Sequence, residues 1–147
     1  MVVLKPACDR WKFFFGFVLL LSGAFGCGRD GDGSRKFNLI VSGVDFQVYN
    51  DSNVFTALTI AGSTAAPNES SAIISDDGWE VYYRSVLTQD ISYQLYYFVD
   101  DNSNGLCDAP PEDPGWIKTI DDFTGQVRLE VSVNEEQDDP CKPFQAI

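Results

Sequence analysis

Apolar and polar residues alternate in short runs along most of this chain. The clearest run is residues 126–133, in which Val127, Leu129, Val131 and Val133 fall on one side and polar or charged residues fall on the other. Successive side chains of a β-strand point to opposite faces, so a period of two predicts a strand with one buried face.

Six further runs are rich in β-branched and aromatic residues, which favour strands. They are residues 37–44, 54–62, 71–75, 79–86, 91–99 and 115–120. The run at 91–99 is the most apolar, so we expect it to be central in its sheet. Residues 63–71 are typical of a polar loop, and Asp76-Asp77-Gly78 predicts a hairpin between the runs on either side of it.

Seven runs separated by frequent turn residues, without helical periodicity, predict an all-β protein. The expected architecture is an antiparallel β-sandwich of about seven strands, similar to immunoglobulin and prealbumin domains, over residues 36–147. An open barrel is the alternative.

The amino terminus has the organisation of a secretory signal. Lys5, Arg10 and Lys12 precede an apolar run at 13–21, and small residues follow that run. The run is shorter than the roughly 20 residues that a membrane-spanning helix needs. We therefore expect residues 1–26 to be a signal peptide, whose helix is removed; the alternative is a buried helix of the domain.

Gly26-Cys27 after this apolar run resembles the end of a bacterial lipoprotein signal peptide. The resemblance implies that Cys27 is lipidated and becomes the new amino terminus, although Phe25 stands where that family has a small residue. Ala24 and Gly26 also suit ordinary signal peptidase, which would leave Cys27 as a free thiol. On the lipoprotein reading, residues 27–35 form a flexible tether, and the protein is exported and anchored in the cell membrane or outer membrane.

Charge and composition exclude several functions. The formal net charge of −12 disfavours nucleic acid as a partner, because its phosphates would be repelled. The chain contains no histidine, which excludes Ser-His-Asp and Cys-His catalysis and histidine-ligated zinc within this chain.

The stretch from Asp100 to Asp113 has the pattern of a calcium loop. Asp-x-Asn-x-Asn-Gly places side-chain oxygens at alternate positions, and the glycine permits a sharp turn after the third of them. The twelfth position is Pro111, so the closing carboxylate must come from a later residue. The expected calcium ligands are Asp100, Asn102, Asn104, the Leu106 carbonyl, Asp108, and Glu112 or Asp113.

This loop resembles those of dockerins and of thrombospondin type 3 repeats. It is more similar still to a loop of small exported bacterial β-sandwich proteins, in which a strand ending in Tyr-x-Val-Asp continues into such a motif. The alternative is a solvated Asn/Asp turn, since Asp, Asn and Gly also favour turns without a metal.

Cys107 and Cys141 are the cysteines that remain if the signal peptide is removed and Cys27 is lipidated. In an oxidising compartment an even pair usually closes, so we expect a disulfide between them. Two unrelated thiols are the alternative.

These features favour a non-catalytic scaffold or adhesion protein of the cell envelope, serving a cell-surface protein or a glycan. One alternative is a carbohydrate- or peptide-binding module that uses exposed aromatic residues: Trp79, Tyr82, Tyr83, Tyr93, Tyr96, Tyr97 and Trp116. Because aromatics occur on both faces of the 91–99 run, core packing is the favoured role for them. The other alternative is a small calcium-dependent hydrolase that uses the loop carboxylates.

Overall fold

The computed structural model describes residues 34–146 as seven β-strands and two short 3-10 helices. The elements are β1 (Lys36–Val44), η1 (Gln47–Tyr49), β2 (Asn53–Ile60), β3 (Asn68–Ile73), β4 (Trp79–Thr88), β5 (Tyr93–Asp100), β6 (Gly115–Ile120), β7 (Val127–Ser132) and η2 (Lys142–Ala146). The predicted signal peptide and Cys27 lie outside the described residues. Within those residues, no helix is long and apolar enough to cross a bilayer.

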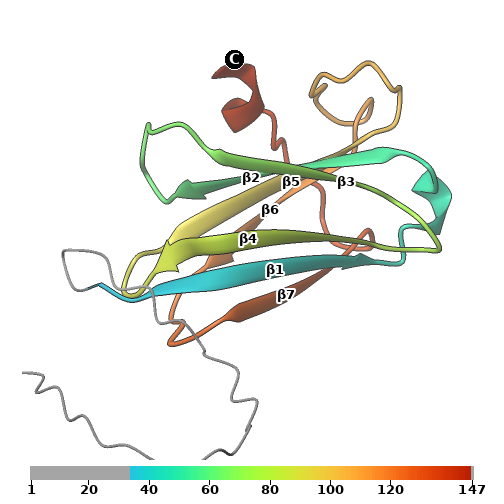
Figure 1. Ribbon diagram of the computed structural model, residues 1–147. Helices are drawn as coiled ribbons and strands as arrows, with labels where there is room; N and C mark the ends of the chain where they lie inside the picture. Colours follow the sequence, from blue (N-terminus) through green and yellow to red (C-terminus); the bar gives the residue numbers. More distant parts are fainter. Residues whose placement is uncertain (1–33, 147) are drawn as a thin grey trace, which may run out of the picture.

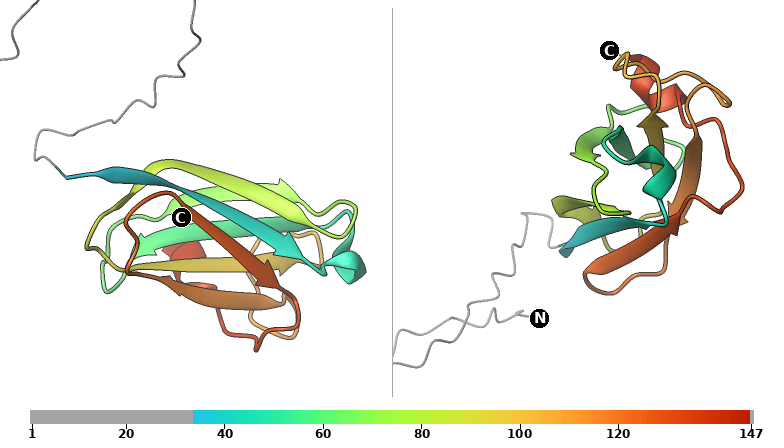
Figure 2. Two further views of the ribbon diagram at one scale, coloured as in Figure 1. Left: turned by 90° about the horizontal axis from the view of Figure 1, so that it is seen from below. Right: turned by 90° about the vertical axis from the view of Figure 1, so that its right-hand side faces the viewer.

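The strands form two sheets that pack face to face (Figure 1). One sheet has the order β4-β1-β7, and the other has the order β3-β2-β5-β6. The left view of Figure 2 shows the three-stranded sheet in front of the four-stranded one. The prediction of a seven-stranded β-sandwich is therefore confirmed.

One pair of strands departs from the expected antiparallel pattern. β1 lies between β4, which is antiparallel to it, and β7, which is parallel to it, with Leu39 beside Val127 and Val44 beside Ser132. β6 is in the other sheet, so the chain reaches β7 by changing sheets rather than through a hairpin. That crossing allows β7 to enter beside β1 in the parallel direction.

The turn at Asp76-Asp77-Gly78 also differs from the prediction. Both aspartates have positive φ (49° and 89°), and Ser75 and Gly78 form an isolated bridge, so the tight turn itself is present. It does not close a hairpin, because β3 pairs with β2 and β4 pairs with β1. The turn instead carries the chain from one sheet to the other.

Residues 68–71, which we expected in a loop, belong to β3. This strand lies at the edge of the four-stranded sheet and pairs with β2. Asn68, Glu69 and Ser71 are exposed, so this edge strand does not need the apolar residues by which buried strands are identified. The Thr56 hydroxyl donates a hydrogen bond to the Ser70 carbonyl at 3.1 Å.

Between the sheets, the core contains a cluster of four aromatic rings from four segments. Phe46 packs edge-on against Trp79 and Trp116, with ring centroids 5.8 and 5.7 Å away. Tyr97 stacks on Trp116 at 5.3 Å and tilts against Trp79 at 5.9 Å. All four side chains are at most 6% exposed. Edge-to-face and offset arrangements are the ones that aromatic quadrupoles favour.

β5 is an inner strand of the four-stranded sheet, as expected, between β2 and β6. Its inner face contributes Tyr93, Leu95, Tyr97 and Val99 to the core. On the opposite face Phe98 is only 2% exposed, because Phe55 and Phe144 pack against it. Burial on both faces explains the continuous apolar run in the sequence.

Candidate functional site

The acidic loop connects β5 to β6 and carries all the predicted calcium ligands. Its first ligand, Asp100, is the last residue of β5 and is 2% exposed. Its oxygens accept hydrogen bonds from the backbone N–H groups of Asn104 and Gly105, both at 3.0 Å. Gly105 has φ of 72°, a conformation that glycine adopts without steric cost, so the chain can curl back over the carboxylate.

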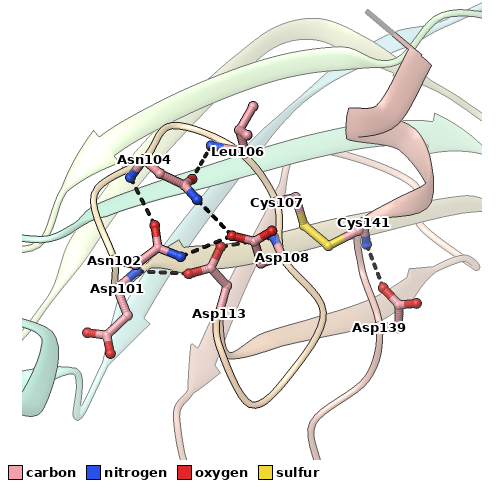
Figure 3. Close-up of a disulfide and its surroundings, with 9 residues drawn as sticks. All are labelled: Asp101, Asn102, Asn104, Leu106, Cys107, Asp108, Asp113, Asp139 and Cys141. Carbon is pink, nitrogen blue, oxygen red and sulfur yellow. Dashed lines mark hydrogen bonds between the residues drawn. A yellow bond between two sulfur atoms is a disulfide. The ribbon is translucent and has the colours of Figure 1, made fainter.

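Asp113 returns to the same loop from its far end (Figure 3). Its side chain is fully buried and accepts hydrogen bonds from the backbone N–H groups of Asp101 at 3.1 Å and Asp108 at 3.0 Å. Glu112 is exposed. Of the two closing residues considered from the sequence, Asp113 is the one that the structure brings into the loop.

Asn102, Asn104 and Asp108 form the exposed part of the loop. The side-chain amides of Asn102 and Asn104 both donate to one oxygen of Asp108, at 3.0 and 2.8 Å. The carbonyl oxygens of these amides accept the backbone N–H groups of Asn104 and Leu106, at 3.0 and 2.7 Å. Asn102 and Asn104 therefore both contact Asp108, through their amide nitrogens rather than their oxygens, and the calcium ligand set stays a prediction.

Leu106 contributes no apolar packing inside this cluster. Its side chain is 65% exposed and points away from the Asn and Asp side chains (Figure 3). Its backbone N–H donates to Asn104, and the role of its carbonyl as a calcium ligand stays a prediction.

The electrostatics of the loop set Asp108 and Asp113 apart. Hydrogen bonds from Asn102 and Asn104 hold the pKa of Asp108 below its usual value. Burial raises the pKa of Asp113; backbone hydrogen bonds from Asp108 and Asp101 lower it in part, and the charges of Asp100 and Asp108 raise it further. The loop thus holds a buried carboxylate beside two others, an arrangement that costs free energy unless a proton or a cation offsets the charge.

The donor chemistry of the loop suits a hard cation. Calcium binds carboxylate, amide and backbone oxygens, and these are what the loop offers. Among residues 34–146, acidic and cysteine side chains alone do not form a group of three that could hold a metal ion. A calcium site here therefore needs the oxygens of Asn102 and Asn104 in addition to the carboxylates.

A disulfide between Cys107 and Cys141 joins the loop to the carboxyl-terminal segment, as predicted, with the Cα atoms 5.4 Å apart. Asp139 accepts the backbone N–H of Cys141 at 3.1 Å. Downstream of the bridge, Phe144 packs edge-on against Phe98 with centroids 4.9 Å apart. This role of Phe144 is not evident from its own sequence context; the one signal for it is the apolar character of the 91–99 run on both faces.

The seven aromatic residues considered as a sugar platform do not form one exposed surface. Trp79, Tyr83, Tyr93, Tyr97 and Trp116 are buried in the core, which confirms the favoured interpretation for them. Tyr82 is 49% exposed on β4, whereas Tyr96 lies half-buried on β5, in the other sheet.

Comparisons of the chain with protein-family models, with curated proteins and with solved structures found no match.

Proposed function

We propose that this protein is a lipid-anchored, non-catalytic domain of the cell envelope whose β5–β6 loop binds a structural calcium ion. The observation that supports the calcium proposal best is the position of Asp113. This carboxylate is fully buried at the end of a motif that already contains Asp100 and Asp108; burial raises its pKa, and their charges raise it further. Bound calcium would supply positive charge to these carboxylates.

The amide groups of the loop support the same proposal. The positive ends of two side-chain amides, from Asn102 and Asn104, point at one oxygen of Asp108. They partly neutralise that carboxylate on the side where a cation would be attracted. Rotation of either amide about its terminal bond would turn its oxygen toward the same point and make it a ligand for calcium. The rotation would break the hydrogen bond that this oxygen accepts from the backbone N–H of Asn104 or Leu106, a loss that calcium coordination would have to outweigh.

The backbone hydrogen bonds of Asp100 and Asp113 would keep both carboxylates in place before calcium binds. Each of them accepts two backbone N–H groups, and each carboxylate oxygen has a further lone pair. Such preorganised ligands lower the entropic cost of binding. The ion would in turn fix the loop whose Cys107 anchors the carboxyl-terminal segment.

The orientation of the domain fits a role in presentation. β1 begins at one end of the sandwich, and the acidic loop lies at the opposite end (Figure 1). If Cys27 carries the lipid, the tether enters the end of the domain that is nearer the membrane. The calcium loop would then face away from the membrane, where partners are accessible.

The calcium proposal is tested by thermal unfolding of the purified full chain in calcium and in chelator. Binding to the folded form alone raises its stability by RT ln(1 + [L]/Kd), about 2.7 kcal/mol at a hundredfold excess over Kd. We expect millimolar calcium to raise Tm by several degrees and equimolar magnesium to do much less, because magnesium demands a tight octahedral site.

Asp108→Asn is the informative variant, since Asp108 is only partly buried and its loss should leave the fold intact. It should abolish most of the calcium-dependent rise in Tm. The control is Glu136→Gln, which removes an exposed carboxylate outside the loop and should retain the rise. Identical unfolding curves in calcium and in chelator would contradict the proposal.

A further inference from the structure

A groove of about 620 Å³ lies beside the acidic loop, lined by Phe55 and Phe98, which lie on the face of the four-stranded sheet that is turned away from the core. Its floor is aromatic. Phe55 of β2 and Phe98 of β5 are opposite each other in the sheet and stack with centroids 5.2 Å apart and ring planes 18° apart. This volume is within the range of sites that bury a ligand or a large side chain.

The walls of the groove come from two segments that the disulfide holds together. Phe144 forms one wall and packs edge-on against Phe98, while Leu106, 65% exposed, forms another with its loop neighbours. The Cys107–Cys141 bridge connects the two walls covalently. The groove is therefore already formed in the folded domain.

The polar part of the lining is acidic. Glu69 of the edge strand β3 and Asp108 of the loop both line the groove, and of the residues that the structure describes no lysine or arginine does so. The whole chain carries a formal net charge of −12. An occupant with apolar and positively charged groups side by side would match both the floor and the rim.

We propose that this groove binds a basic peptide segment of a partner protein, with one large apolar side chain over Phe55 and Phe98 and flanking lysines or arginines beside Glu69 and Asp108. An aromatic anchor in an aromatic-lined pocket is the kind of contact that dominates peptide affinity. The acidic rim favours encounter with a basic segment and disfavours an acidic one.

The edge strand at the rim favours a peptide over a small organic cation. Glu69 and Ser70 belong to β3, which has a neighbouring strand on one side within the described part of the chain. Every second backbone N–H and C=O of an edge strand points outward, and an extended peptide can pair with those groups. The floor and walls do not depend on calcium, because they are formed by Phe55, Phe98, Phe144 and the disulfide. The charge of Asp108, which is also a proposed calcium ligand, does depend on it, so the calcium concentration is held fixed in the test and Glu69 is the acidic residue that is varied.

The test is isothermal titration calorimetry on the full chain in nonionic detergent, at a fixed calcium concentration, with three synthetic peptides. Lys-Lys-Trp-Lys-Lys should bind. Lys-Lys-Ala-Lys-Lys should bind at least about tenfold more weakly, because it lacks the anchor. Glu-Glu-Trp-Glu-Glu should show no binding, because its charges are repelled by the rim.

Two pairs of variants locate the site, and all four replaced side chains are exposed, so folding should not be affected. Leu106→Ser should weaken binding of the tryptophan peptide about fivefold or more, whereas Val48→Ser, at a residue 78% exposed outside the groove, should not. Glu69→Gln should weaken it about threefold, whereas Glu136→Gln should not. Equal affinity for the tryptophan and alanine peptides, or full affinity in both Leu106→Ser and Glu69→Gln, would overturn the proposal.

Discussion

Gly43 is buried in β1 directly opposite Trp79 of β4. A β-carbon at this position would overlap the indole ring of Trp79. The indole in turn contacts Phe46 and Tyr97 in the aromatic cluster of the core. Because Gly43 has no side chain, Trp79 has room to pack in the four-ring cluster of the core.

We predict that Gly43→Ala destabilises the domain by about 1–3 kcal/mol, the usual cost of overpacking a well-packed core. Urea unfolding followed by tryptophan fluorescence measures the loss directly. Gly125→Ala is the control, because a β-carbon there meets no atom within 4 Å; it should change stability by less than about 0.5 kcal/mol. Equal unfolding midpoints for the two variants would show that Trp79 can move aside without cost.

At the scale of elements, the acidic loop and the carboxyl-terminal segment behave as one unit. The disulfide joins them across a sequence separation of 34 residues. On one side of the bridge, Asp113 accepts hydrogen bonds from the backbone of Asp101 and Asp108 and so holds the loop closed. On the other side, Phe144 packs against Phe98 of β5. The carboxyl-terminal segment also pairs with the edge of β6, where the Asp138 N–H donates to the Gly115 carbonyl at 2.9 Å.

Removing the bridge should loosen this unit. For a closed loop of this length, chain entropy predicts that Cys141→Ser lowers the free energy of unfolding by about 3–4 kcal/mol. Denaturant unfolding under non-reducing conditions measures the change. Cys107→Ser should cost about the same and the double variant no more than either, because each removes the same bond; additive losses would mean that the thiols act separately.

The elements also show which features can be recognised in the sequence. The alternation at Val127–Val133 identified β7, and the apolar run before Asp100 identified an inner strand. The run at 71–75 identifies the second half of β3, but the sequence pattern places its polar first half in a loop, because an edge strand with exposed side chains does not need an apolar pattern. The Asp76–Gly78 turn was correct locally but wrong in what it connects, because local turn chemistry does not determine which strands pair.

The spacing of Asp, Asn and Gly residues is enough to locate the acidic loop. It does not tell which of the two carboxylates, Glu112 or Asp113, lies inside the loop. Both are carboxylates one residue apart, and only the folded chain distinguishes the buried one from the exposed one. Asp113 directly precedes Pro114, Gly115 and Trp116, which are all buried where β6 begins. Its place beside this buried segment is the feature that separates it from Glu112.

At the scale of the whole molecule, the proposed lipid anchor would determine where the domain acts. Cys27 and the signal peptide lie outside the described residues, and the first residue of the fold is near the end of the predicted tether. The carbonyl of Arg35, which we assigned to the tether, accepts the backbone N–H of Gln89 at 3.3 Å. This hydrogen bond lies just ahead of β1, which begins at Lys36.

We predict that Cys27→Ser moves the protein from the membrane fraction to the soluble fraction, because thioether-linked lipid would be the anchor. Fractionation of cells followed by immunoblotting measures the distribution. Cys8→Ser is the matched control: Cys8 lies within the predicted signal peptide, so this variant should stay in the membrane fraction. A Cys27→Ser protein that remains with the membranes would exclude lipid on this cysteine as the anchor.

The parallel pairing of β1 with β7 has a consequence for the order in which the domain can be completed. The first strand of the fold acquires its second neighbour only after residues 127–132 have emerged, at the opposite end of the chain. Pairing between such distant segments has a high entropic cost of loop closure and slows folding. A nascent chain that stops short of Val127 leaves one edge of β1 open to strands of other molecules. Protein synthesis and folding are thereby coupled: the sandwich closes only when residues up to Ser132 are available, and chains that end earlier are the ones most exposed to aggregation.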